Sequence, residues 1–428
     1  DTIMSATTLF DTRYEKQKED LLQQVIEGLR AVFTADELAA LRIDPVNPAI
    51  LSQRSGRGFV DRDILETVLG NLLECVAPGS HNALEPSYKR QELADSLGEV
   101  ADQVYAMIAQ SFLAVGEEEE IEDKALAATY ALLRDLPRLK ERAMWNRFAS
   151  LKDPAVWDSY LRQRCGISDE ALAEYDFAAK LDQAIEVRDL GIYRDFLGGF
   201  KCSSIFDYQM QLVMSTYPGW RVLFYHDVAH DLTRSGPIDG TLAWTAVPLL
   251  PRAISELGGR YYQADLHPET RIGDANFLDH PHRGLTTGQT GVIGSGCHLL
   301  PCTMGGMTRK LRQRHPIIGD YVIIGTDADV FGPVRVGDHA VIGPSSEIYG
   351  LVEIGPRCHI GLSVVIGTVK VGERKPGRIV LGEGVRVGDG TIIENRAEID
   401  LLIPDQAQIP ARSHVTNDGC GKPRFVRE

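Results

Sequence analysis

A six-residue period in the second half of the chain constrains the fold more than any other feature of the sequence. Every sixth residue from Ile318 to Ile366 is aliphatic, and glycine follows in most of these cases. A period that keeps one aliphatic phase over so many repeats marks an internal structural repeat. The period slips at residues 371–380 and resumes with Leu381.

This repeat predicts a parallel β-helix built from hexapeptides. Each hexapeptide forms one short flat face, three faces form a coil of about 18 residues, and the aliphatic side chains stack inside the prism. Glycine permits the tight corners between faces. Because one coil cannot bury its own core, stability depends on the stacking of coils. The repeats are then mainly a scaffold, and function is expected where the repeat is interrupted.

A helical period occupies the first part of the chain. Apolar residues recur three and four positions apart in residues 19–33, 90–115 and 169–187, as amphipathic helices require. The expected fold class is therefore multi-domain α+β, with an N-terminal all-α domain before the β-helix. The expected divisions are a trimmed, disordered or vector-derived end at residues 1–10, the helical domain at 11–260, the β-helix at 261–405 and a C-terminal tail at 406–428.

Composition and charge exclude several classes of protein. The 428 residues include 60 Asp and Glu against 45 Lys and Arg, so the chain repels polyanions and no nucleic-acid partner is expected. No apolar run has the length of a membrane span, and the first residues lack a signal-peptide pattern, which indicates a cytoplasmic protein without a membrane partner. The seven cysteines include no CxxC pair and are expected to be reduced and mostly buried.

Polar chemistry concentrates between residues 261 and 320, where the repeat is interrupted. Seven of the 11 histidines lie between His226 and His315. Asp265 and His280 are 15 residues apart, close to the length of one coil, so their side chains are expected at neighbouring heights on one edge of the prism. A carboxylate beside an imidazole fixes its tautomer and raises its basicity, as general-base catalysis requires.

The same region resembles the serine O-acetyltransferases, a family of left-handed β-helix acyltransferases. The spacing from Asp265 to His280 and from His280 to His315 agrees with the family's pattern. The resemblance covers roughly residues 200–335, so it explains neither the long helical region nor the last coils. The segments that carry it are YPGWRVLFYHDVAH at 217–230, PLLPRAISELGGRYYQADLHPETRIG at 248–273, LDH at 278–280, TMGG at 303–306 and RHPIIGD at 314–320.

The resemblance implies an enzyme that transfers acetyl from acetyl-CoA directly to the hydroxyl of L-serine, giving O-acetylserine for cysteine biosynthesis. Its fold would be the left-handed form of the parallel β-helix. His280 matches the family's general base and Asp265 matches the carboxylate partner of that base. Acetyl-CoA is the implied co-substrate, and no metal is expected.

The remaining site residues also follow from the resemblance. Asp279, Arg314 and His315 match positions that hold the amino-acid substrate, or the L-cysteine that inhibits by taking the same place. Gly305 and Gly306 match the glycine pair along the thioester arm of acetyl-CoA.

The resemblance further implies a homo-oligomer. Each active site would lie between adjacent prisms of a trimer, and helical N-terminal domains in this family pair trimers into hexamers. The sequence does not decide between trimer and dimer of trimers. The terminal FVRE lacks the isoleucine end with which many members bind cysteine synthase, so that complex is doubtful.

Departures from the family concern the acceptor. Most members carry Asp-Pro before the YPG segment, and that aspartate contacts the substrate amine. Residues 189–207 contain no Asp-Pro, which leaves Asp195 and Asp207 as unaligned alternatives. The family's Gly-Glu-Thr reads Gly-Gln-Thr here, with Gln289 in place of the acid. An acyltransferase for homoserine, another amino acid or a sugar therefore stays an alternative.

Two further classes compete with this interpretation. A non-catalytic hexapeptide-repeat scaffold would leave the clustering of Asp, His and Arg at the family's positions unexplained. A zinc-dependent β-helix carbonic anhydrase needs three histidines around a metal, typically with a His-x4-His element. The nearby histidines His280, His282, His298 and His315 do not have that spacing.

Overall fold

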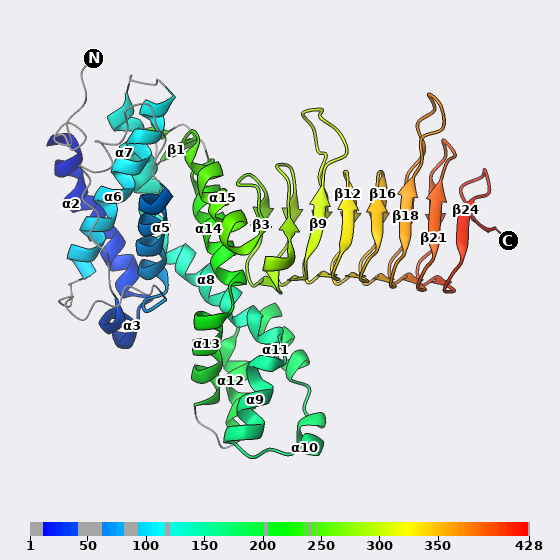
Figure 1. The fold of residues 1–428 in the computed structure, drawn as a ribbon, viewed down its shortest axis with the longest axis horizontal. Coiled ribbons are helices and arrows are strands. Elements are labelled where there is room, and N and C mark those ends of the chain that lie inside the picture. Colours follow the sequence, from blue (N-terminus) through cyan, green and yellow to red (C-terminus); the bar gives the residue numbers. More distant parts are fainter. Residues whose placement is uncertain are drawn as a thin grey trace. The chain divides into compact units, whose positions relative to one another are not determined.

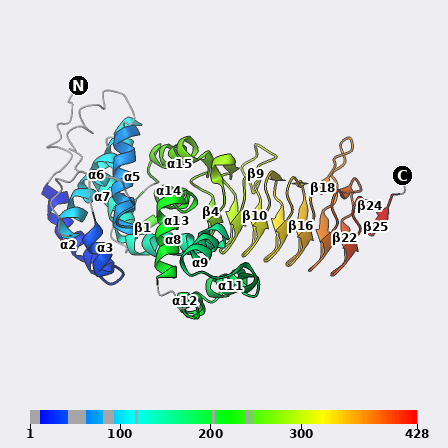
Figure 2. The same cartoon turned by 60° about the horizontal axis from the view of Figure 1, so that its bottom comes forward.

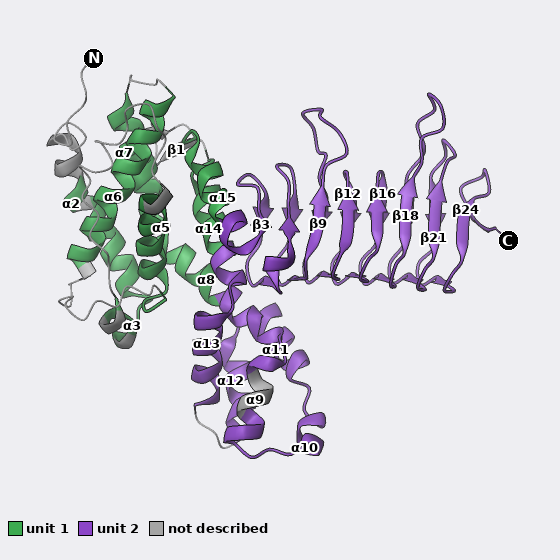
Figure 3. Cartoon of the chain, viewed as in Figure 1, with its two compact units in different colours: residues 1–144, 223–257 green, residues 145–222, 258–428 purple. Residues whose placement is uncertain are grey.

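The protein consists of a helical region followed by a parallel β-solenoid (Figure 1). The computed structural model describes residues 12–41, 62–80, 93–115, 120–200, 204–234, 236–238, 242–244 and 246–426. The N-terminal end expected at residues 1–10 lies outside these ranges. Contacts divide the chain into two compact units, residues 1–144 with 223–257 and residues 145–222 with 258–428 (Figure 3).

The first unit is mainly helical. The middle of α6 is buried on nearly all sides, since the consecutive residues Val104, Tyr105, Ala106 and Met107 are all buried, as expected for the central helix of a bundle. One short antiparallel strand pair lies within the region expected to be all helical. The elements are α2 (Thr12–Arg30), α3 (Ala35–Ala40), α5 (Arg62–Val76), α6 (Leu93–Ala114), α7 (Ile121–Arg134), β1 (Gly236–Ile238), β2 (Leu242–Trp244) and parts of α8 (Leu136–Ala149), α14 (Gly219–Asp231) and α15 (Leu250–Tyr262).

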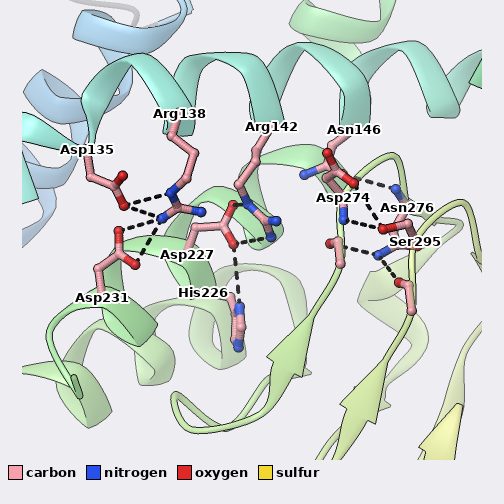
Figure 4. A network of polar contacts seen from close by, with 12 residues as sticks. Asp135, Arg138, Arg142, Asn146, His226, Asp227, Asp231, Asp274, Asn276 and Ser295 are labelled. Carbon is pink, nitrogen blue, oxygen red and sulfur yellow. Dashed lines mark hydrogen bonds and ion pairs between the residues drawn. The ribbon is translucent and has the colours of Figure 1, made fainter. Parts of the chain in front are cut away.

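Paired charges join α8 to α14 inside the first unit (Figure 4). Arg138 and Arg142 are one helical turn apart, as are Asp227 and Asp231, so two guanidinium groups face two carboxylates. Arg142 makes two bonds to Asp227, of 2.9 and 2.7 Å, and Arg138 Nη2 lies 2.9 Å from Asp231 Oδ2. Although burial alone would raise it, the pKa of Asp227 is lowered to about 2 by Arg142. The Arg142–Asp227 pair therefore stays ionised at neutral pH.

The second unit begins with a group of short helices. Ser168 accepts a hydrogen bond from the N–H of Ala171 and begins α10, as its position before an acidic pair predicts. The helical stretch expected over 169–187 is interrupted, because Asp176 caps a new helix by accepting from Ala179. The elements are η1 (Ser150–Lys152), α9 (Ala155–Arg164), α10 (Asp169–Ala173), α11 (Phe177–Glu186), α12 (Leu190–Gly198) and α13 (Ile205–Thr216).

Three parallel sheets form the faces of the solenoid, and each is named here by its first strand (Figure 2). The β4 sheet contains β4 (Arg271–Ile272), β7 (Val292–Ile293), β10 (Ile317–Ile318), β13 (Arg335–Val336), β16 (Val352–Ile354), β19 (Ile379–Leu381) and β22 (Leu401–Ile403). The β5 sheet contains β5 (Phe277–Leu278), β8 (His298–Leu299), β11 (Ile323–Ile324), β14 (Val341–Ile342), β17 (His359–Ile360), β20 (Arg386–Val387) and β23 (Gln408–Ile409).

The β3 sheet contains β3 (Ala264–Asp265), β6 (Leu285–Thr286), β9 (Cys302–Gly305), β12 (Ala328–Phe331), β15 (Glu347–Tyr349), β18 (Val365–Thr368), β21 (Ile392–Asn395), β24 (His414–Asn417) and the antiparallel β25 (Pro423–Phe425). The parallel ladders thus continue beyond residue 405, where a C-terminal tail was expected. A short 3-10 helix, η2 (Pro281–Arg283), lies in the turn between β5 and β6.

The strand register follows the six-residue period of the sequence. Ile318 pairs with Val336, and Val336 pairs with Ile354, which gives coils of 18 residues. All three side chains are buried and stack inside the solenoid. The two longest loops follow β9 and β18 (Figure 1). The predicted helical region and parallel β-helix are confirmed.

Among the described residues, the cysteines follow the expectation of free thiols except at Cys165. Cys165 is disulfide-bonded, so the expectation of reduced cysteines is wrong at that position. The free cysteines among the described residues are Cys75, Cys297, Cys302 and Cys358, which are buried, and Cys420, which is exposed.

Neighbouring isoleucines of β21 provide a matched test of the solenoid core. Ile393 is fully buried, whereas Ile392 points outward and is 42% exposed. We expect Ile393→Ala to lower the free energy of unfolding by about 2–5 kcal/mol, because it leaves a cavity in the stack. Ile392→Ala should change it by only about 0.5 kcal/mol. Urea unfolding of the full chain would measure both, and equal losses would contradict this account of the core.

Candidate functional site

The turn after β5 presents an exposed imidazole at one corner of the solenoid. His280 has a left-handed backbone, with φ 48° and ψ 46°, which few residues other than glycine adopt. Pro281 then begins η2, and its ring fixes the direction of the chain. The His280 side chain is 61% exposed, so it is accessible to a ligand.

Asp279 lies between two histidines at this corner. Its Oδ1 is 3.4 Å from Nε2 of His280, and its Oδ2 is 3.2 Å from Nε2 of His298. His298 comes from β8, the neighbouring strand of the β5 sheet, and its ring stacks on Phe277 at a centroid distance of 4.7 Å. The sequence had not suggested a role for His298 beside Asp279.

The YPG segment packs directly against this corner. A Cβ atom on Gly219 would lie 2.3 Å from the carbonyl oxygen of Leu278, so only glycine allows the approach. Tyr217, two residues earlier, donates a hydrogen bond of 2.6 Å to Oδ2 of Asp153. Burial raises the pKa of the Tyr217 hydroxyl, and Asp153 and Asp279 raise it further. Both carboxylates therefore act on the same phenol.

Asp153 is followed by Pro154, and it is a candidate site residue that the sequence alone did not indicate. An Asp-Pro pair is expected just before Tyr217, whereas helices α9–α13 lie between Asp153 and Tyr217, which are 64 residues apart. The alternatives Asp195 and Asp207 are exposed on α12 and α13. The signal that would have found Asp153 is the dipeptide itself, upstream of the inserted helices.

A second cluster surrounds His315 at the corner between the β3 and β4 sheets. The backbone N–H of Thr290 donates to Nδ1 of His315 at 3.2 Å, so Nδ1 is an acceptor and the neutral ring carries its proton on Nε2. A Cβ atom on Gly288 would lie 2.0 Å from the ring, and one on Gly306 would lie 2.9 Å from it. Burial, together with the charges of Arg314 and His267, lowers the pKa of His315.

Arg314 is held by a short chain of hydrogen bonds in the same cluster. Its Nη2 donates to Oε1 of Gln289 at 2.7 Å, and Nε2 of Gln289 donates to Oε2 of Glu269 at 2.9 Å. Gln289 therefore occupies a position between a cation and an anion, where its amide satisfies both. A neutral residue here leaves the positive charge of the guanidinium uncompensated at this contact.

The structure brings the predicted site residues together in two groups rather than one. Asp279 and His280 lie at the corner between the β5 and β3 sheets, because the turn after β5 leads to β6. Arg314, His315 and Gly306 lie at the corner between the β3 and β4 sheets. Among the hydrogen bonds and ion pairs of the described residues, none joins the two groups.

Asp265 and Gly305 both lie on the β3 sheet. Asp265 ends β3, and its carbonyl oxygen accepts from the N–H of Thr287 at 2.9 Å. Asp279 has a carboxylate oxygen at ion-pair distance from His280. Gly305 ends β9, where the Phe331 ring lies 2.6 Å from the position of an added Cβ.

Neither a metal-binding group nor a membrane-spanning helix occurs among the described residues. No group of three or more His, Cys, Asp or Glu side chains is arranged to hold a metal ion. In the same part of the chain, every helix is too short or too polar to cross a membrane.

The fold places the chain among β-solenoid proteins with a helical N-terminal region. The native serine acetyltransferase 1 of Entamoeba histolytica superimposes with a TM-score of 0.51 and 19% identity, over 80% of this chain and 99% of that one. Isoform 3 of the same organism, solved in complex with cysteine, gives a TM-score of 0.50 and 20% identity, over 83% and 95%. At these identities the likeness shows the fold alone.

Sequence relatives define the family. A serine acetyltransferase of Staphylococcus aureus is 30% identical over 177 residues, which are 41% of this chain and 71% of that protein. The chain belongs to the serine acetyltransferase family. The serine acetyltransferase of Synechococcus elongatus is 30% identical over 125 residues, or 29% of this chain. The match spans about half of that relative, at 47% of its length. No family model matches the chain.

Removing the charge of Arg314 should raise the pKa of His315. Burial would still disfavour the imidazolium in Arg314→Gln, but the repulsion from the neighbouring guanidinium would be gone. The titration of the His315 ring protons by NMR would measure the change. Arg312→Gln is the control, because Arg312 is exposed in the same loop and should leave the His315 titration unchanged. An unchanged titration in Arg314→Gln would contradict the electrostatic explanation.

Proposed function

We propose that the protein is a serine O-acetyltransferase that forms O-acetylserine, for cysteine biosynthesis, from acetyl-CoA and L-serine in the cytoplasm. The observation that carries the proposal is the corner at Asp279. It places an exposed imidazole, His280, 3.4 Å from one carboxylate and beside the Tyr217–Asp153 pair. Membership of the family supports the same activity.

The proposed chemistry is direct transfer. His280 removes the proton of the acceptor hydroxyl as the oxygen attacks the thioester carbonyl, and the imidazolium then protonates the departing CoA thiolate. The new bond is C–O, the broken bond is C–S, and the proton passes from oxygen to sulfur. Backbone N–H groups of a glycine-containing turn would stabilise the oxyanion. We propose Asp265 as the carboxylate that orients His280, while Asp279, which lies 3.4 Å from the same imidazole, binds the acceptor.

A covalent acyl-enzyme is not needed. Burial raises the pKa values of Cys297 and Cys302 to about 12, so neither thiol is ionised at neutral pH. The thiolate is the nucleophilic form of cysteine. Both side chains are buried and are better explained as part of the solenoid core.

The proposed acceptor site uses opposite charges for the two ends of an amino acid. Asp279 and Asp153 would bind the ammonium group, and Arg314, with its planar fork, would bind the carboxylate beside His315. L-Cysteine would inhibit by occupying this place. Gly305 and Gly306 would lie along the thioester arm of acetyl-CoA. Gln289 in place of the family's glutamate keeps homoserine and other acceptors as the second candidate.

We propose that the active site is shared within a homotrimer. Asp279 and His280 lie at one edge of the β3 sheet, and Arg314 and His315 lie at the other, so one chain does not enclose an amino acid between them. Closed three-fold symmetry repeats a heterologous contact and joins one corner of a prism to the other corner of its neighbour. Whether helical regions pair such trimers is a further proposal.

His280→Ala should lower kcat by about 10²–10⁴-fold, the usual contribution of a general base. The measurement is release of CoA thiol from acetyl-CoA with L-serine, and in parallel with homoserine, threonine and amino sugars. His282→Ala is the control, because His282 is exposed two residues away. Wild-type turnover only with another acceptor would favour the second candidate. Absence of turnover with all acceptors would favour a scaffold.

Mixing two inactive chains should restore activity if the site is shared. In a trimer assembled at random from His280→Ala and Arg314→Ala chains, some sites are intact. In these sites the Arg314→Ala chain supplies the His280 corner and the His280→Ala chain supplies the Arg314 corner. Each of the two corners of a site is unaltered with a chance of one half, so about a quarter of the sites would be intact. The mixture is refolded together and assayed with L-serine, and each variant refolded alone is the control. No recovery in a verified mixed trimer would contradict the shared site.

A further inference from the structure

His298 makes a contact that the proposed chemistry leaves unexplained. Its Nε2 lies 3.2 Å from Oδ2 of Asp279. An ionised carboxylate only accepts hydrogen bonds, so the proton must be on Nε2 of His298. Asp279 then has one oxygen bound by His298 and the other 3.4 Å from His280. The carboxylate is held between two imidazoles that come from different parts of the chain.

The His298 ring is fixed more firmly than the carboxylate it contacts. It stacks on Phe277 at 4.7 Å with an angle of 28° between the rings. Its backbone N–H donates to the carbonyl of Val322 at 3.0 Å, and its side chain is 22% exposed. A group fixed on a strand by ring packing and a backbone hydrogen bond positions its partner better than a group in a loop.

We infer that His298 is a positioning residue that orients Asp279 to receive the ammonium group of the acceptor amino acid. The inference rests on the proposed function, because it assigns the role of a residue at the same site. Asp279 follows the end of β5 and is bonded through its backbone N–H to Leu299. Its main chain is therefore fixed, and the remaining freedom is rotation of the carboxylate.

The surrounding charges explain why that rotation matters. The titratable groups around Asp279 are His280 and His298, which contact it, and the Tyr217–Asp153 pair, on which it acts electrostatically. One Asp279 oxygen already lies 3.4 Å from Nε2 of His280; without His298, the carboxylate would be free to turn fully toward His280 and would compete with the acceptor hydroxyl for that imidazole. With His298 in place, the carboxylate does not rotate. The remaining lone pairs of its two oxygens therefore point in fixed directions, and an ammonium group can bind to them.

The test replaces His298 with leucine and with glutamine. We expect His298→Leu to raise KM for L-serine by about tenfold, the effect of losing one charge-assisted hydrogen bond, with KM for acetyl-CoA unchanged and kcat changed less than about threefold. His298→Gln should keep KM for L-serine within about threefold of wild type, because its amide nitrogen can donate at a similar reach.

Two further variants separate positioning from general damage. His359→Leu is the matched control, because His359 is an exposed histidine of the same β5 sheet, three strands away along the ladder; it should leave every kinetic constant unchanged. In an Asp279→Asn background, His298→Leu should add no further increase in KM, since its effect acts through the carboxylate. Calorimetric binding of L-serine should show the same order of affinities as KM.

The inference is overturned if His298→Leu leaves KM for L-serine unchanged, if it raises KM for acetyl-CoA equally, or if glutamine is as poor as leucine. Each of these outcomes is measured on a variant of a wild-type protein that is itself active. Failure of the proposed function appears instead in the wild type, as absence of binding and turnover with every amino acid. Turnover with an amino acid other than serine would leave the inference standing, since the ammonium group is common to all of them.

Discussion

Stacking of aliphatic side chains inside the solenoid is the interaction on which the rest of the second unit depends. Ile318, Val336 and Ile354 occupy equivalent places in successive coils, and each would be exposed without its neighbours. Because side chains alternate between the two sides of a strand, a slip of one residue would turn this whole set toward water. The core therefore fixes the register, and the register fixes which side chains point outward at each corner.

Corners tolerate the irregularity that the faces exclude. Each face is only two to four residues long in its central strands, whereas the segments after β9 and β18 expand into loops without disturbing the ladders. The functional candidates lie at such places. His280 takes a left-handed conformation in the turn after β5, and His315 lies against Gly288 and Gly306 at the end of the loop after β9. Rigid faces and variable corners together give a precise but adaptable site.

The sequence predicted what depends on short-range pattern. Hexapeptide periodicity was sufficient for the β-solenoid, and the resemblance to the serine O-acetyltransferases supplied Asp279, His280, Arg314 and His315 as predicted site residues. What it could not supply were distances that depend on inserted segments. Asp153 was hidden because helices α9–α13 separate it from Tyr217. The His298–Asp279 contact was hidden because Leu278 pairs with Leu299, which makes the first coil 21 residues long instead of 18. The same longer coil weakens the argument that paired Asp265 with His280 by their spacing.

The two corner clusters differ in charge in a way that matches an amino acid. Asp279 and Asp153 make one corner anionic, whereas Arg314 makes the other cationic. Gln289 strengthens this division, because it binds Arg314 through a neutral oxygen at 2.7 Å. A glutamate in its place would neutralise the guanidinium and weaken its attraction for a carboxylate. The negative charge nearby belongs to Glu269, one hydrogen bond further away and exposed to solvent, where screening reduces its effect. The Gln289 exchange, which keeps acceptors other than serine as alternatives, therefore leaves Arg314 better suited to bind a carboxylate.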